Sequence, residues 1–237
     1  MPVLAKNLKY IFLWTLVTSA ICLGGTVKDS VLVRSRNGIE SVAGIWTEGS
    51  ASTSPVVVWF HGGMSSGNCQ KGLVAGDDLA RMLPNFTVVS PSACRQNHWV
   101  SADAVDWVDA VLDSVAARRR SPVDTVYLIG VSDGGLGVMT YSLEGRRKVL
   151  SRVLISSFGK MLGDAEPLSR RSGFRSGRWL FIQGGADRLY PSREIVPWIE
   201  TFCKNVGVEC DLRYDPKGEH DWSYWKLNHP EWILKFF

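Results

Sequence analysis

The stretch that decides the fold of this chain is residues 125–139, TVYLIGVSDGGLGVM. It begins as an apolar run of the β type, passes Ser132 between Gly130 and Gly134, and continues into residues that can open a helix. Such a strand-to-helix turn is too tight for side chains at its flanks, and it exposes the serine hydroxyl above the sheet edge. The new helix aims its first N–H groups at any oxygen beside that hydroxyl. The alternative is a glycine-rich connection in which Ser132 has no chemical role.

The length and composition of the chain are those of one globular domain. With 237 residues it can bury a full core, and 45% hydrophobic with 21% charged residues is ordinary for this class. The net charge is +4, and arginine clusters at 118–120, 146–147 and 170–171 lie beside expected helix ends, where cations are favourable. No aromatic-basic RNA motif or zinc-ligand spacing is present. We therefore expect no nucleic-acid partner, no metal and no cofactor, and the oligomeric state stays open.

The N-terminus differs in kind from the rest of the chain. Lys6 and Lys9 precede residues 10–25, which carry no charge and end in small residues. A basic head, an apolar run and small residues are typical of an export signal. The run is nearly long enough to cross a bilayer, so an uncleaved anchor is the alternative. We expect residues 1–25 to be a signal peptide or N-terminal membrane anchor, and residues 26–237 to form a secreted, periplasmic or otherwise extracytoplasmic domain, membrane-associated if the anchor is kept.

Cysteine usage agrees with export. Removing residues 1–25 leaves Cys69, Cys94, Cys203 and Cys210, and four cysteines permit three pairings. We predict Cys69–Cys94 and Cys203–Cys210, because each pair flanks a single loop or helix-to-strand connection. An oxidising compartment would let both bonds persist. The alternative is four free, buried thiols.

Short runs rich in branched and aromatic residues recur along the chain, and most are apolar throughout, as strands buried on both faces must be. They occupy residues 56–60, 86–89, 125–129, 153–155, 179–182 and 208–214. Helix-like segments lie between them; the clearest is 102–119, which Ser101 can cap. Ahead of them, residues 31–33 and 41–46 flank a turn signal and predict a hairpin. The pattern predicts an α/β fold, a mostly parallel sheet with an antiparallel N-terminal hairpin and helices on both faces.

Polar residues follow several of these strands. In a parallel sheet, reactive side chains gather at the carboxyl ends of the strands. Ser132, Asp187 and His220 each follow one of the expected strands, in that chain order. A hydroxyl, a carboxylate and an imidazole in this order are typical of a nucleophile elbow.

These motifs resemble the α/β-hydrolase superfamily, and more narrowly the small secreted serine esterases of the esterase D, feruloyl-esterase and polyhydroxybutyrate-depolymerase type. The resemblance covers residues 31–237. It is carried by residues 61–63 (HGG), 130–135 (GVSDGG), 185–188 (GADR) and 218–222 (GEHDW), with Tyr224-Trp225 following. It implies an α/β-hydrolase fold and a carboxylesterase that acts on small-molecule esters through a Ser-His-Asp acyl-enzyme mechanism. Together with residues 1–25, it predicts an exported serine esterase.

The chemistry needs each of these side chains. Ser132 is a weak nucleophile at neutral pH and needs a base, which His220 can supply before it returns the proton to the leaving alcohol. Asp187 would hold the tautomer of the imidazole and stabilise its charged form. We therefore predict Ser132, His220 and Asp187 as the catalytic residues.

The tetrahedral intermediate also needs N–H donors where its negative charge develops. We expect the first from the backbone of Asp133 and the second from the loop after residues 56–60, at Gly63, with Met64 as the reserve. His61 is expected to brace this loop by hydrogen bonding rather than to act as a base.

Other polar residues have competing explanations. His98 either lines the substrate pocket or lies in a surface loop, and His229, next to a proline, is expected to be structural. Asp221 is expected to cap the last helix. Three other carboxylates compete with Asp187 for the role of the acid: Asp164, Glu194 and Asp215.

The segment 158–178 is too short and polar for an apolar lid, so we expect an open site. Trp99, Trp222 and Trp225 are expected near its mouth, where they could stack on an aromatic or sugar-linked acyl ester of modest size. Acyl-chain length and physiological substrate stay open.

Three rival functions share part of this pattern. A serine peptidase of the prolyl-oligopeptidase type has a similar acid loop but usually carries an extra propeller domain. An acyltransferase would share the acyl-enzyme and differ only in its acceptor. An exported binding protein could keep the fold without activity, although it would have no need of all three catalytic side chains.

Overall fold

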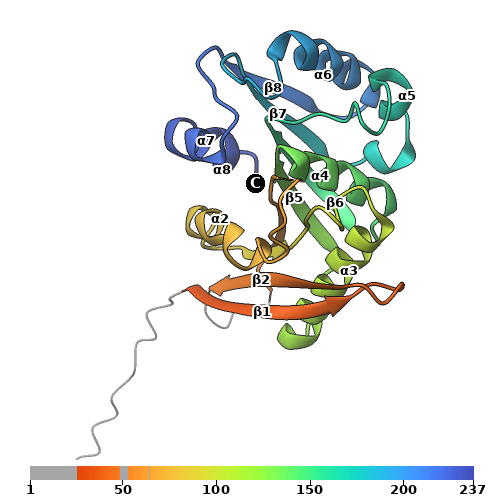
Figure 1. The fold of residues 1–237 in the computed structure, drawn as a ribbon, viewed down its shortest axis with the longest axis vertical. Coiled ribbons are helices and arrows are strands. Elements are labelled where there is room, and N and C mark those ends of the chain that lie inside the picture. Colours follow the sequence, from red (N-terminus) through yellow and green to blue (C-terminus); the bar gives the residue numbers. More distant parts are fainter. Residues whose placement is uncertain (1–25, 49–52, 64) are drawn as a thin grey trace, which may run out of the picture.

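The computed structural model describes residues 26–48, 53–63 and 65–237 (Figure 1), so the predicted signal or anchor segment and Met64 lie outside the described residues. The described part forms one eight-stranded sheet with the order β1-β2-β4-β3-β5-β6-β7-β8. The strands are β1 (Thr26–Arg34), β2 (Glu40–Glu48), β3 (Val56–Phe60), β4 (Thr87–Pro91), β5 (Thr125–Val131), β6 (Lys148–Ile155), β7 (Arg178–Gly184) and β8 (Cys210–Asp215).

The pairing of the strands confirms the predicted mixed sheet. β1 and β2 form an antiparallel hairpin, and β2 pairs antiparallel with β4. From β4 through β3, β5, β6 and β7 to β8, every neighbouring pair is parallel. Each predicted strand lies within or overlaps an observed one. β8 begins two residues later than the predicted run 208–214 and follows Gly207, which ends the preceding helix in the left-handed conformation with φ 77°.

Helices cover both faces of the sheet, as predicted, and Figure 1 shows the two groups on opposite sides. One group comprises α3 (Ala102–Arg119), α4 (Asp133–Glu144), α5 (Ala165–Ser169) and α6 (Ser192–Val206). The other comprises α2 (Asp77–Met82), α7 (Trp222–Asn228) and α8 (Pro230–Leu234), and the short α1 (Gly72–Ala75) lies against β2 and β4. Along β3, Val58 and Phe60 belong to the first core cluster whereas Val57 and Trp59 belong to the second, so alternate side chains feed opposite cores.

The predicted helix 102–119 is confirmed as α3, and the side chain of Ser101 accepts a hydrogen bond from the Ala104 N–H at 3.2 Å. Between β6 and β7 the chain forms only α5 and a turn of 3₁₀ helix, Ser172–Phe174. The prediction that no large lid is inserted there is therefore confirmed. None of the described helices has the length and apolar character needed to cross a membrane.

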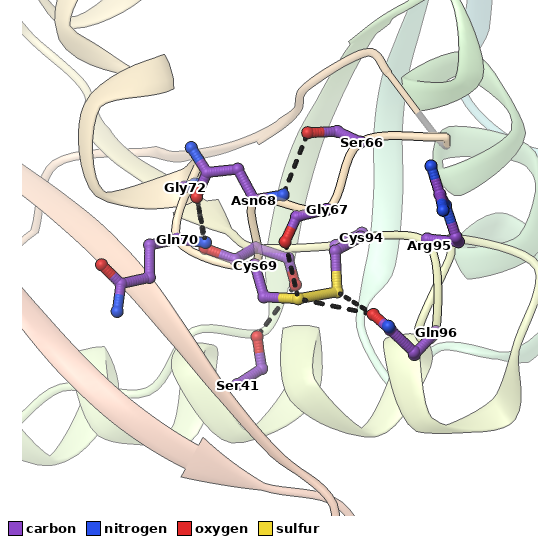
Figure 2. Close-up of a disulfide and its surroundings, with 12 residues drawn as sticks. Ser41, Ser66, Gly67, Asn68, Cys69, Gln70, Gly72, Cys94, Arg95 and Gln96 are labelled. Carbon is purple, nitrogen blue, oxygen red and sulfur yellow. Dashed lines mark hydrogen bonds between the residues drawn. A yellow bond between two sulfur atoms is a disulfide. The ribbon is translucent and has the colours of Figure 1, made fainter.

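Both predicted disulfides are formed, Cys69–Cys94 and Cys203–Cys210. The first joins the loop before α1 to the loop after β4, and Figure 2 shows it beside Ser66, Gly67 and Gln96. The second joins α6 to the edge strand β8. Disulfides of this kind are typical of proteins that fold in an oxidising compartment.

Candidate active site

Ser132 occupies the turn between β5 and α4 with φ 55° and ψ −126°. An L-residue rarely adopts this conformation, which typically costs about 1–3 kcal/mol of strain and persists only where the surroundings enforce it. The Ser132 N–H donates to the Ile155 carbonyl, and the Ser132 carbonyl accepts from the Gly135 N–H, each at 2.9 Å. These bonds fix a strained serine at the carboxyl edge of the sheet.

The glycines on both sides of the turn are sterically required. A Cβ atom on Gly134 would lie 1.9 Å from the carbonyl oxygen of Phe60. A Cβ atom on Gly130 would lie 2.3 Å from the carbonyl oxygen of Gly134. Because both obstacles are backbone atoms, they cannot move aside as a flexible side chain can. The close approach of α4 to the end of β3 therefore explains the glycine pattern around Ser132.

Replacing Gly134 with alanine is expected to lower the free energy of unfolding by about 1–3 kcal/mol or more, because the new methyl group overlaps the Phe60 carbonyl. Urea denaturation measures the change. The control is Gly67→Ala, where an added Cβ meets no heavy atom within 4 Å, and its effect should stay within about 0.5 kcal/mol. Equal losses in the two variants would contradict the steric explanation.

His220 and Asp187 form a hydrogen-bonded pair at the same edge of the sheet. Nδ1 of His220 lies 2.9 Å from Oδ2 and 3.0 Å from Oδ1 of Asp187. Asp187 follows β7 and its side chain is fully buried, whereas the His220 side chain, between β8 and α7, keeps 16% of its surface exposed. Two residues separated by 33 positions in the sequence are thus brought together, and the imidazole keeps access to solvent.

The environment of Asp187 favours its charged form. Burial by itself would raise the pKa of this carboxyl, but hydrogen bonds from His220 and from the N–H groups of Tyr190 and Leu189 outweigh it and lower the pKa. These two backbone donors lie 2.8 Å and 3.0 Å from Oδ1. Asp187 therefore stays ionised and accepts the Nδ1–H of His220, which leaves Nε2 of the ring as the proton acceptor.

The loop that carries His220 is held by contacts with Ser156 and Gly184, whose roles no sequence motif indicates. Ser156, just beyond β6, has φ 47°, and its hydroxyl donates to the Glu219 carbonyl at 3.4 Å and accepts from Trp225 Nε1 at 3.2 Å. Gly218 packs against Gly184 so closely that a Cβ atom on Gly184 would lie 2.0 Å from the Gly218 carbonyl oxygen. The positive φ of Ser156 and these packing contacts arise only from the tertiary structure.

The loop after β3 has a fixed hydrogen-bonding pattern around His61. Nδ1 of His61 lies 2.9 Å from the Gly62 carbonyl, and Nε2 accepts the Ala93 N–H at 3.0 Å. Because Ala93 can only donate, Nδ1 must carry the proton of the neutral ring. Lys71 Nζ also donates to the Gly62 carbonyl at 3.3 Å. His61 therefore braces this loop as expected.

The burial of the His61 imidazole predicts that the protein loses stability in acid. Burial lowers the pKa of His61 from 6.5 to about 4, although its hydrogen bond to Gly62 favours the charged form. As the pH falls, His61 binds a proton in the unfolded chain before it does so in the folded protein. The stabilisation from the neutral, buried ring is therefore complete above about pH 6.5. It is lost towards pH 4, which lowers the free energy of unfolding by about 3 kcal/mol. In His61→Asn, urea denaturation between pH 7 and 4 should show a correspondingly smaller loss than in the wild type. Equal losses would contradict this assignment.

The predicted oxyanion donors come from segments close to Ser132. α4 begins at Asp133, the residue after the turn. A Cβ atom on Gly62 would lie 3.2 Å from the Ser132 Cβ, so the loop after β3 packs directly on the serine. Gly63 has φ 88°, which favours glycine, and because the Gly62 carbonyl is held by His61 and Lys71, the Gly63 N–H of that planar peptide points the opposite way.

Comparison with known proteins gives the fold a name. No protein-family model and no curated protein sequence matches this chain. Among solved structures, a ferulic acid esterase aligns with a TM-score of 0.66 at 16% identity, over 90% of this chain and 99% of its own. An S-formylglutathione hydrolase from Agrobacterium tumefaciens gives 0.65 at 16% identity, over 90% and 96%. The fluorophosphonate-binding serine hydrolase FphF of Staphylococcus aureus gives 0.65 at 15% identity, over 90% and 99%.

This protein has the α/β-hydrolase fold. The alignments span nearly the whole of these three proteins, and the sheet has the mixed order described above. At these identities the likeness establishes the fold alone.

Within this α/β-hydrolase fold, the prediction that Trp99 and Trp225 lie near the mouth of the site is wrong. Trp99 is 3% exposed, packs on Phe60 and donates its indole N–H to the His61 carbonyl at 2.8 Å. Trp225 has no exposed surface at all. Both rings are core residues because they fill the space behind the loops that carry the site. Trp222 is half-buried, with its ring 4.7 Å from that of Trp59.

The other polar candidates have structural partners in the α/β-hydrolase fold. His229 Nε2 lies 2.7 Å from Asp215 Oδ2, which also accepts from the Tyr224 hydroxyl at 2.6 Å. Asp164 pairs with Lys160 and Glu194 with Arg193, both at exposed positions. These contacts give each rival carboxylate a partner away from His220.

Two further predictions concern loop and cap residues. His98 is half-buried, and its carbonyl accepts the Ser101 hydroxyl at 2.9 Å. Asp221 does occupy the N-cap position of α7, but its side chain accepts no capping hydrogen bond within the described part of the chain.

Proposed function

We propose that this protein is an exported serine hydrolase that cleaves carboxylic esters, with Ser132, His220 and Asp187 as its catalytic residues. The observation that carries the proposal is the hydrogen bond between the buried Asp187 and His220, at the same sheet edge as a serine held at φ 55°. A carboxylate this buried and this well supplied with donors is suited to hold an imidazole. The strained serine conformation is of the kind that clusters at active sites.

In the proposed reaction, Nε2 of His220 takes the proton of the Ser132 hydroxyl while Oγ attacks the carbonyl carbon of the ester. The tetrahedral intermediate collapses when the bond to the alcohol oxygen breaks and His220 returns the proton to that oxygen. Water then repeats the sequence on the acyl-enzyme, which releases the acid and restores Ser132.

We assign the oxyanion hole to the backbone N–H groups of Gly63 and Asp133. The supporting observations are the close packing of Gly62 on Ser132 and the start of α4 at Asp133. Each such donor typically contributes about 10²–10³ in rate, because it meets the negative charge only as that charge forms.

Export is part of the proposal and rests on residues 1–25 of the sequence together with the two disulfides. The charge-free run after Lys6 and Lys9 is typical of a signal or anchor, and the disulfides suit an oxidising compartment.

A substrate panel tests the reaction class. Purified protein is assayed with p-nitrophenyl acetate, butyrate and octanoate beside a prolyl p-nitroanilide, and with a sugar alcohol as competing acceptor. We expect ester hydrolysis to exceed anilide cleavage and acyl transfer. Faster anilide cleavage would assign a peptidase, and transfer outrunning hydrolysis would assign an acyltransferase. Folded protein that neither turns over an ester nor reacts with a fluorophosphonate would be a binding protein.

A further inference from the structure

Tyr190 touches the acid, the base and the helix of the predicted nucleophile. Its N–H donates to Asp187 Oδ1 at 2.8 Å. Its ring meets the His220 ring edge-on, with centroids 5.2 Å apart and planes at 85°. Its hydroxyl donates to Asp133 Oδ1, the first residue of α4, at 3.3 Å. One side chain thus links the loop after β7 to the turn at Ser132.

Contacts with Gln183 and Phe158 fix the position of Tyr190. Its carbonyl accepts a hydrogen bond at 2.9 Å from Nε2 of Gln183, which is fully buried at the end of β7. Its ring packs edge-on against Phe158 at 5.8 Å, and Phe158 packs in the same way against Trp198. The hydroxyl therefore has a defined place rather than a freely sampled one.

The hydroxyl of Tyr190 stays protonated at neutral pH. Burial raises its pKa to about 12, helped by the negative charge of Asp133 and the hydrogen bond to it, while a hydrogen bond with the Ser132 side chain acts in the opposite direction. A neutral phenol is a hydrogen-bond donor, and the Asp133 carboxylate is the acceptor that it meets.

A carboxylate one residue after the nucleophile needs such a donor. Negative charge at Asp133 suits the first turn of α4 but opposes the negative charge that forms at the reacting carbonyl beside Ser132. A hydrogen bond to Asp133 draws that charge towards the phenol and fixes the carboxylate in one orientation.

We propose that Tyr190 is a positioning residue for ester hydrolysis, whose hydroxyl holds the Asp133 carboxylate while its ring supports His220. The inference rests on the proposed function and adds to it a residue outside the catalytic three. The charged or titratable groups facing Tyr190 are Asp133 on α4, Asp187 in its own loop and His220 from the loop after β8.

Removing only the hydroxyl tests the proposal. In Tyr190→Phe we expect kcat/KM for p-nitrophenyl butyrate to fall about tenfold, the size that loss of one hydrogen bond to a charged group predicts. The acid limb of the pH–rate profile should move to higher pH, because a carboxylate without its donor stabilises protonated His220 more strongly.

The matched control is Tyr224→Phe, which breaks another tyrosine–aspartate bond, to Asp215, beside the same loop. It should lower the free energy of unfolding and leave the acid limb in place, because Asp215 is not held beside Ser132.

A double-mutant cycle identifies the partner of the hydroxyl. In the Asp133→Asn background, Tyr190→Phe should no longer move the acid limb of the pH–rate profile, because the carboxylate charge that the Tyr190 hydroxyl binds is no longer there. Asp133→Asn alone should move the limb to lower pH, and this arm still decides the matter if Tyr190→Phe does not fold.

Each result has a separate meaning. A shift in Tyr190→Phe that Asp133→Asn suppresses supports the positioning role. An acid limb unchanged in both single variants, or equal to that of Tyr224→Phe, overturns it while esterase activity stands. A wild-type protein without esterase activity overturns the proposed function itself.

Discussion

Replacing Ser132 with alanine is expected to lower kcat/KM for p-nitrophenyl butyrate by about 10⁶-fold, the loss typical when the nucleophile of a triad is removed. Without Oγ no acyl-enzyme forms, and only the oxyanion donors and binding contacts remain. Labelling by a fluorophosphonate should disappear together with the activity. Far-UV circular dichroism and the unfolding midpoint should stay close to those of the wild type, since the backbone bonds of Ser132 do not involve its hydroxyl.

The control for this prediction is Ser223→Ala. Ser223 is an exposed serine in the first turn of α7, three residues from His220, so the substitution makes the same chemical change near the site. It should leave turnover and labelling intact. If Ser132→Ala kept more than a small fraction of the activity, another nucleophile would be at work and the proposed mechanism would fail.

The turn at Ser132 could be predicted from sequence because its signal, a serine between two glycines after an apolar run, lies within one short segment. Glycine is the residue that fits where α4 passes within contact of the end of β3, and a branched apolar run marks the strand before it. A rule of topology predicts Asp187 and His220 as site residues, namely that parallel strands bring their carboxyl ends to one edge. That rule gave the side of the sheet, and the structure adds the 2.9 Å contact between the two residues.

The supporting residues could not be predicted, because their roles depend on contacts between distant segments. Nothing near Ser156 in the sequence indicates a positive φ or a bond to the Glu219 carbonyl, 63 residues away. Tyr190 lies 57 residues from the aspartate that its hydroxyl meets. For Trp99 and Trp225 the prediction of an exposed position is wrong, because it relied on closeness in the sequence. Nearness in sequence to site loops suggested exposure, but tryptophans next to such loops fill the core beneath them.

Asp187→Asn is expected to lower kcat/KM by about 10⁴-fold while Ser132 and His220 remain in place. The carboxylate can only accept, so it requires the proton of His220 on Nδ1 and leaves Nε2 free to take the Ser132 proton. An amide can present its NH₂ group to Nδ1 instead, which puts the proton on Nε2 and removes the base. Michaelis–Menten kinetics should locate the loss in kcat, since the substitution does not change the surface that binds the ester.

The same substitution should change the pH dependence of stability in a defined direction. The pKa of Asp187 is lowered in the folded state despite its burial. The ionised carboxylate therefore stabilises the fold at pH values above the pKa that this carboxyl has in the unfolded chain. This stabilisation is lost as the pH falls through the pKa of Asp187 in the folded protein. The asparagine variant has no such loss, because its side chain does not titrate. The gap in unfolding free energy between wild type and Asp187→Asn should therefore narrow on acidification, and a gap that widened would contradict the role of the ionised carboxylate.

The control that separates the acid of the triad from a structural acid is Asp215→Asn. Asp215 also follows a strand of the sheet and also bonds to an imidazole, that of His229, and its hydrogen bonds from Tyr224 and His229 lower its pKa to about 2. Its loss should reduce stability with little effect on kcat, because His229 stacks on Trp232 at 3.9 Å and is held as part of the packing of α8. If Asp215→Asn removed activity and Asp187→Asn did not, the acid would have been assigned to the wrong strand, and the alternative raised by the sequence would be correct.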